Sequence, residues 1–229
     1  MKSDRNRKRF LFVEGSSDKN ITSEILDIYL PHWQIVSRRK KSKNPIKDPR
    51  IDIIDARGIN NITSERLATA ASDSNLHSLG IVIDADTNAQ SRWDGICQTC
   101  KAVDELDHIP FPKQIPNQGF VEKIDNDKKF GIWVIPDNHS PGMTETLLSQ
   151  LIPNDREDLW IHVQTSVSQA KQLGATFDDK HLDKAHIYTW LAWHHKPGAW
   201  LKTGERAVFN FDHPQVHAFV DWLKTLYDL

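Results

Sequence analysis

The sequence predicts an α/β fold in which helices flank a mostly parallel sheet, with a helical C-terminal extension. Up to Asp107, short apolar runs typical of strands alternate with segments whose apolar residues recur at helical spacing. The run LGIVIDADTN, from Leu79, is continuously apolar before its acidic end, as in strands covered on both faces. Such alternation favours parallel strands joined by right-handed crossovers.

The elements follow in order from Arg9. Glycines end the first two strands, and a serine or an aspartate is placed to cap the first helix. Thr63 or Asn61 is placed to cap the second helix. The predicted elements are a strand at 9–15, a helix at 16–30, a loop from Ser37 to Arg50, a strand at 51–58, a helix at 61–74, the strand from Leu79, and a helix that ends near Asp107.

The second half predicts a hairpin and then helices. QGFVEKI and KFGIWVIP flank the polar turn DNDK, and four helical segments follow from Gly142 onward. Residues 1–150 are expected to form the α/β domain, and residues 151–229 the helical extension packed on it. Five tryptophans are expected to pack these helices: Trp160, Trp190, Trp193, Trp200 and Trp222.

Composition excludes several classes of protein. Hydrophobic residues make up 38% and charged residues 26%, so the chain has apolar area to bury and is not expected to be disordered. No apolar run approaches the ~18–20 residues of a membrane span. Cys97 and Cys100 lack further ligands for zinc and are expected to be reduced thiols of a cytosolic protein. Neither a P-loop nor a dinucleotide-binding glycine motif is present.

Positive charge is concentrated in two clusters, although the net charge is −2. One cluster lies before the first strand, and the other includes Arg38, Arg39 and Lys40. Either a solvated surface or a phosphate-binding role accounts for such clusters.

Acidic side chains gather where strands end. Asp84 and Asp86 are two residues apart, so strand geometry would place both carboxylates on one face, and Glu14 ends the first strand. These three side chains can converge at the carboxyl edge of a parallel sheet, where hard oxygen ligands suit Mg²⁺ or Mn²⁺. Taken singly, each acid equally fits a turn or helix cap.

The motifs FLFVEGSSDKNI and GIVIDADTN resemble the glutamate-glycine and DxD motifs of the Toprim superfamily. Two further segments follow, GIWVIPDNHSPGMTETLL and IYTWLAWHHKPG. The four segments in this order are similar to those of small bacterial Toprim-like proteins of unknown function. Those proteins are related to the nuclease domain of overcoming-lysogenization-defect proteins. The resemblance spans most of the chain and implies a Toprim-like sheet.

The resemblance also implies roles for individual residues. Glu14 would act as general acid/base or as a metal ligand, and Asp84 and Asp86 as Mg²⁺ ligands. Asp18 matches a position that is often acidic, and it also fits a helix cap. Glu145 is a candidate additional ligand, or a first-turn glutamate favoured by the helix dipole.

Three functions remain open at this point. The first is a Mg²⁺-dependent nuclease that cleaves DNA or RNA phosphodiesters, with Lys19, Arg38, Arg39 and Lys40 as substrate-binding candidates and a separately encoded ATPase as a possible partner by family analogy. The second is a non-catalytic Toprim-fold module that binds metal and nucleic acid. In the third, the acids are structural, which arginine partners would favour. Among the 11 histidines, His139 alone follows a strand on the expected active face.

Overall fold

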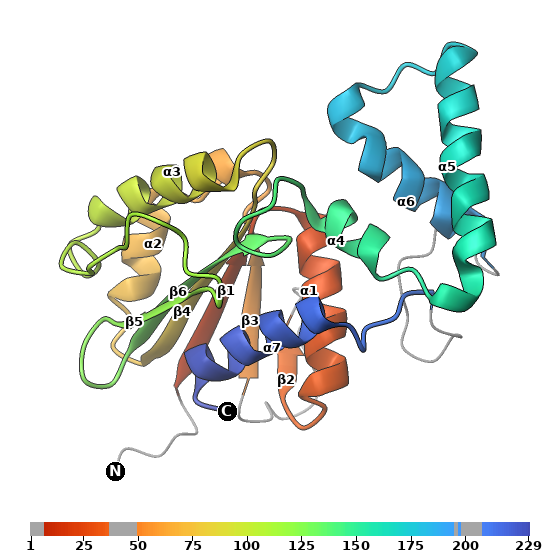
Figure 1. Ribbon diagram of the computed structural model, residues 1–229. Coiled ribbons are helices and arrows are strands. Elements are labelled where there is room, and N and C mark those ends of the chain that lie inside the picture. The colour runs from red at the N-terminus through yellow and green to blue at the C-terminus, as the bar shows by residue number, and fades with distance from the viewer. Residues whose placement is uncertain (1–6, 37–49, 195–196, 198–207) are drawn as a thin grey trace.

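The computed structural model describes residues 7–36, 50–194, 197 and 208–229 (Figure 1). Within them, the strands form one six-stranded sheet in the order β2-β3-β1-β4-β6-β5. The strands are β1 (Lys8–Val13), β2 (Gln34–Val36), β3 (Arg50–Asp55), β4 (Leu76–Asp84), β5 (Phe120–Lys123) and β6 (Lys129–Ile135). All neighbours pair in parallel except β5 and β6. The predicted α/β class with a mostly parallel sheet is confirmed.

The helices follow the predicted order. They are α1 (Ser16–Tyr29), α2 (Ser64–Ala71), α3 (Ala89–Lys101), α4 (Thr144–Gln150), α5 (Glu157–Gln172), α6 (Leu182–Ala192) and α7 (Pro214–Tyr227), with 3₁₀ turns at Ile59–Asn61, Asn154–Arg156 and Asp179–His181. The Thr63 side chain caps α2 by accepting a hydrogen bond from the Arg66 N–H. Asn88 caps α3 in the same way through the Ser91 N–H. These caps satisfy backbone donors that the first helical turn leaves unpaired.

Strand β2 was not predicted. It lies at the edge of the sheet and pairs only with β3. Because it has only three residues, its sequence is too short to show a periodic pattern. Most of the basic segment after it, residues 37–49, lies outside the described residues. Strand β4 begins at Leu76, earlier than expected, because the polar His77 and Ser78 are buried in the sheet.

The sheet is covered on both faces (Figure 1). Helices α1 and α7 pack on one face, where Leu11 and Val82 belong to the core. Helices α2 and α3 pack on the other, against Phe12 and Ile81. Strand β4 lies inside the sheet and is buried along nearly its whole length, which explains its continuously apolar sequence.

Two glycines let α7 approach the sheet closely. A Cβ at Gly80 would stand 2.6 Å from a Leu11 methyl group and 2.8 Å from one of Leu226 on α7. A Cβ at Gly131 would stand 3.1 Å from a Leu226 methyl group and 3.3 Å from the Trp222 ring, both on α7. Glycine at these positions therefore leaves the room that α7 occupies. The last helix thus returns to the sheet from the C-terminal half of the chain.

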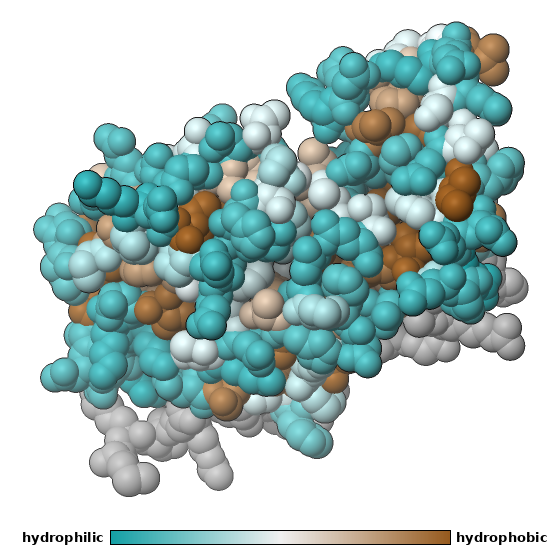
Figure 2. Space-filling model, viewed as in Figure 1, coloured by the Kyte–Doolittle hydropathy of each residue, from teal (hydrophilic) through white to brown (hydrophobic). Residues whose placement is uncertain are grey.

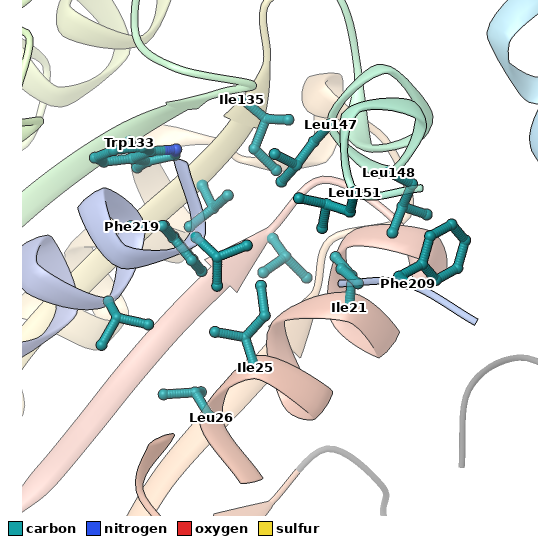
Figure 3. Close-up of a cluster of buried hydrophobic side chains, with 14 of the residues drawn as sticks. Ile21, Ile25, Leu26, Trp133, Ile135, Leu147, Leu148, Leu151, Phe209 and Phe219 are labelled. Atoms are coloured by element: carbon teal, nitrogen blue, oxygen red, sulfur yellow. The ribbon is translucent and has the colours of Figure 1, made fainter. Parts of the chain in front are cut away.

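Helices α5 and α6 form an arm that stands away from the sheet (Figure 1). Figure 3 shows the adjoining core, where Ile21 of α1, Leu148 of α4 and Phe209 meet. Trp190 and Trp222 are buried, as expected, and Trp160 is partly buried against the same core. Trp193 is 41% exposed, but its ring packs beside His162 of α5, and Trp200 lies outside the described residues.

Figure 2 shows hydrophobic surface on this arm. The large apolar side chains exposed there are Ile161, Leu173, Leu182, Tyr188 and Trp193.

Cys97 and Cys100 lie on one face of α3, and both are buried and free. Burial raises the pKa of the Cys97 thiol to about 12. No helix in the described part of the chain is long and apolar enough to cross a membrane.

Candidate functional site

The candidate site lies where the sheet topology reverses direction. After β1 the chain forms β2 and β3 on one side of β1, and it then crosses to β4 on the other side. In open parallel sheets, ligands bind in the crevice that this reversal leaves at the carboxyl ends of the strands. Glu14 directly follows β1, and Asp84 is the last residue of β4. The reversal therefore lies between the two acids that the sequence singles out.

Glu14 and Asp84 are joined by a hydrogen bond. The Asp84 N–H donates to Glu14 Oε2 at 3.3 Å. The predicted convergence of these two residues is thus present. The Glu14 carboxylate is only 18% exposed, and it also accepts a hydrogen bond from Arg92 Nη2 at 2.6 Å. Glu14 therefore lies between the end of β4 and a cation on α3.

Asp84 also binds the start of α4. The Thr144 N–H donates to Asp84 Oδ1 at 3.0 Å, and the Thr144 hydroxyl donates to Asp18 Oδ1. Asp18, in the first turn of α1, accepts the Gly15 N–H at 2.7 Å through its other oxygen. Asp18 thus performs the capping role that was one of its two expected roles, and it joins β1, α1 and α4.

The buried acids repel one another. Burial raises the pKa of Asp84 well above its usual value, and the neighbouring charges of Asp18 and Glu14 raise it further. Burial likewise raises the pKa of Asp18 to about 6, although hydrogen bonds from Thr144 and Gly15 oppose the shift. Such crowding of negative charge is energetically costly unless a cation or a proton compensates it.

Asp86 differs from its predicted placement. Strand β4 ends at Asp84, and Asp86 has a φ of +48°, so strand alternation does not extend to it. Its carbonyl oxygen accepts the Gly142 N–H at 2.7 Å, which fixes the loop to the segment before α4. The Asp86 side chain is 50% exposed and lies 3.4 Å from Arg92 Nη2. Asp84 and Asp86 are therefore joined by a turn and do not lie on one face of a strand.

Glu145 is buried beneath the same edge. It accepts a hydrogen bond from the Ser17 hydroxyl at 3.1 Å. Lys184 of α6 lies 3.8 Å from the same carboxylate oxygen. The negative charge of Glu145 also contributes to the raised pKa of Asp84. Glu145 is thus close enough to affect the site electrostatically, and its position in the first turn of α4 also fits the dipole explanation.

The predicted basic residues are placed only in part. Lys19 is the fourth residue of α1, in the helix that follows Glu14 and Gly15. Arg38, Arg39 and Lys40 lie outside the described residues. His139 is exposed and lies 3.5 Å from Asp137, in the loop after β6.

The types of side chain at this site suit a divalent cation, but their geometry does not. Carboxylate oxygens are the ligands that Mg²⁺ prefers. Among the described residues, however, no three His, Cys, Asp or Glu side chains are arranged so that they could hold a metal ion. Arg92 contacts Glu14 and Asp86, two of the four expected ligands. The arginine pairing is also the arrangement expected if the acids were structural.

Sequence reasoning missed Arg92, Thr144 and Lys184. Arg92 follows the acidic motif by less than two helical turns, so its position near the site was accessible from the predicted helix. Thr144 and Lys184 contact the acids from α4 and α6, far away in the sequence. No local pattern marks such long-range partners.

Comparison with known proteins gives a family and no function. No curated protein matches the chain, and no solved structure matches it. A family model described as "Protein of unknown function (DUF3226)" matches residues 8–228, nearly the whole sequence. The chain therefore belongs to the DUF3226 family.

Proposed function

We propose that this protein is a Mg²⁺- or Mn²⁺-dependent enzyme that cleaves nucleic acid phosphodiesters, as a Toprim-type nuclease. The observation that carries the proposal is the meeting of Glu14 and Asp84 at the reversal of the sheet. A crowded set of carboxylates at this edge is costly to bury, and a divalent cation would relieve that cost. The motif resemblance to Toprim proteins supports the same reaction class.

Each acid has a distinct role in this proposal. Asp84, Asp86 and Glu14 would hold the cation, and Glu145 would add negative charge from the first turn of α4. When bound, the cation would neutralise phosphate charge and lower the pKa of a water molecule. Glu14 serves as general acid/base or as a ligand. Asp18 accepts the Gly15 N–H and the Thr144 hydroxyl, so it positions α1 and α4 around the site.

The substrate in this proposal is DNA or RNA. Lys19 follows the first motif, and Arg38, Arg39 and Lys40 supply a basic segment that would bind phosphates. A separately encoded ATPase is proposed as a partner by family analogy. The free thiols of Cys97 and Cys100 support a cytosolic location, where disulfides are rare.

A second candidate is a binding module without turnover. The Arg92–Glu14 ion pair favours it, because it neutralises an acid that catalysis would need. Such a module would retain nucleic acid binding and lack cleavage.

Cleavage assays with single- and double-stranded DNA and RNA distinguish the two. We expect cleavage that requires Mg²⁺ or Mn²⁺ and falls at least about 100-fold in Glu14→Ala and Asp84→Asn. Asp125→Ala is the control, since Asp125 lies in the hairpin turn between β5 and β6, at the opposite edge of the sheet. Retained nucleic acid binding without cleavage in wild type would favour the binding module.

A further inference from the structure

A groove of about 820 Å³, which we call the α3 groove, lies between α3 and the loop that follows this helix. Its lining includes Trp93, Asp94 and Lys101 from the helix and Phe111 and Lys113 from the loop. Its volume is within the range of about 300–1,000 Å³ that is typical of ligand sites. Arg92, the residue before Trp93, contacts Glu14, so the groove begins close to the acids without including them.

Side chains of α3 hold the loop wall of the groove in place. Trp93 Nε1 donates to the carbonyl oxygen of Pro112 at 3.1 Å. Gln90 Nε2 donates to the carbonyl oxygen of Lys113 at 2.8 Å. Because both bonds fix the backbone of the loop, a ligand does not have to order this wall when it binds.

Phe111 supplies an aromatic surface that is also held in place. Its ring packs against the rings of Trp93, Phe120 and Phe130, with centroids 5.3–6.4 Å apart. The Phe111 side chain is nevertheless only partly buried, and it lines the groove. A partly exposed ring that its neighbours fix is suited to stacking with a flat ligand such as a nucleic acid base.

Two lysines give the groove positive charge. Lys101 and Lys113 are exposed, and neither amine has an ion-pair or hydrogen-bond partner among the residues that the structure describes. The carboxylate of Asp94, in contrast, already accepts a hydrogen bond from Gln90 at 2.8 Å. The groove therefore combines unpaired positive charge, which attracts phosphates, with a surface on which bases stack.

We propose that the α3 groove binds a single strand of nucleic acid, whose phosphates contact Lys101 and Lys113 and one of whose bases stacks on Phe111. The helix from Trp93 to Lys101 is about 12 Å long, which is the length of about three nucleotides. In a duplex the bases are stacked on one another, so a duplex offers Phe111 no free base face. This inference rests on the proposed function, because it names the form of the nucleic acid substrate, but strand binding in the groove needs no metal ion.

Fluorescence anisotropy in the presence of EDTA tests the proposal on the full chain. The probes are a labelled oligothymidine of about 12 nucleotides and its duplex with oligoadenosine. Lys101→Gln combined with Lys113→Gln should weaken strand binding about tenfold. The slope of log affinity against log salt concentration should become shallower by about 1.4, since two phosphate contacts are lost. Phe111→Leu should weaken strand binding about fivefold, because the stacking surface is lost while an apolar side chain is kept.

A second double variant is the matched control. Lys180→Gln combined with Lys224→Gln removes the same charge from residues that lie away from α3. Lys180 lies 3.9 Å from Asp178 before α6, and Lys224 lies 3.1 Å from Asp221 on α7, which covers the other face of the sheet. This control should bind the strand with the affinity and salt dependence of wild type.

The outcomes separate this inference from the proposed function. Equal strand affinity and equal salt slope in wild type and a folded Lys101/Lys113 double variant overturn the groove, and so does equal binding of strand and duplex or no strand binding by wild type. Free thymidine monophosphate that binds as tightly as the strand overturns strand binding in favour of a single nucleotide. If Phe111→Leu does not fold, the lysine variants alone decide.

Mg²⁺-dependent cleavage is measured separately on the same proteins. Cleavage by a wild type in which the groove variants change no binding leaves the nuclease in place and overturns the groove. Strand binding that depends on the groove, in a wild type that cleaves nothing with Mg²⁺ or Mn²⁺, supports the groove and contradicts the nuclease.

Discussion

Thr144 donates its backbone N–H to Oδ1 of Asp84 at 3.0 Å, across 60 residues of sequence. The hydroxyl of the same threonine donates to Asp18. One residue at the start of α4 therefore binds the end of β4 and the start of α1. The acid site depends on this connection, because it fixes the orientations of two of its buried carboxylates.

Thr144→Val should destabilise the fold by about 1–3 kcal/mol, since Asp18 would lose a buried hydrogen-bond donor. Urea unfolding at neutral pH measures the change. Thr165→Val is the matched control, because the Thr165 hydroxyl is exposed and bonds only within α5. Equal losses in the two variants would contradict a specific role for the Thr144 hydroxyl.

The contribution of Asp18 to the stability of the fold should fall as pH rises from about 4 to about 7. Burial raises the pKa of Asp18 to about 6 from a usual value of 3.8, so the folded state binds more protons in this window than the unfolded state. Stability then decreases with rising pH, by up to about 3 kcal/mol from this group. Asp84 acts in the same direction, because burial also raises its pKa.

Urea unfolding across this pH range tests that sign. Asp18→Asn should make the free energy of unfolding depend less on pH, because an asparagine side chain does not titrate between pH 4 and pH 7. This holds even if the substitution lowers stability at every pH. Asp125→Asn, in the exposed hairpin turn, should keep the wild-type slope. The same slope in wild type and Asp18→Asn between pH 4 and pH 7 would contradict the raised pKa of Asp18.

Gly80→Ala should destabilise the protein by about 1–3 kcal/mol through overpacking. The added Cβ would meet side-chain atoms of Leu11 and Leu226 well inside van der Waals contact. Gly95→Ala on α3 is the control, because its Cβ would meet nothing within 4 Å and alanine favours the helix by about 0.5–1 kcal/mol. If both variants shifted stability alike, α7 would not pack as closely as described.

Much of the fold could be predicted because its signals are local. Helical spacing, caps such as Thr63 and the apolar run of β4 each depend on neighbouring residues. Strand β2 escaped prediction because three residues at a sheet edge carry no period. The burial of His77 and Ser78 escaped because it depends on what packs over them.

The site divides in the same way. Glu14 and Asp84 could be placed together because parallel strands end at one edge. Asp86 was placed by strand alternation, which fails because β4 ends two residues earlier. Lys184 could not be paired with Glu145, since their contact depends on how α6 docks.

The most direct test of the cation site is anomalous diffraction from crystals of the full chain grown with Mn²⁺. We expect an anomalous peak within coordinating distance of the Asp84 and Asp86 carboxylates. Crystals in which Mn²⁺ is absent from this edge at saturating concentration would contradict the account.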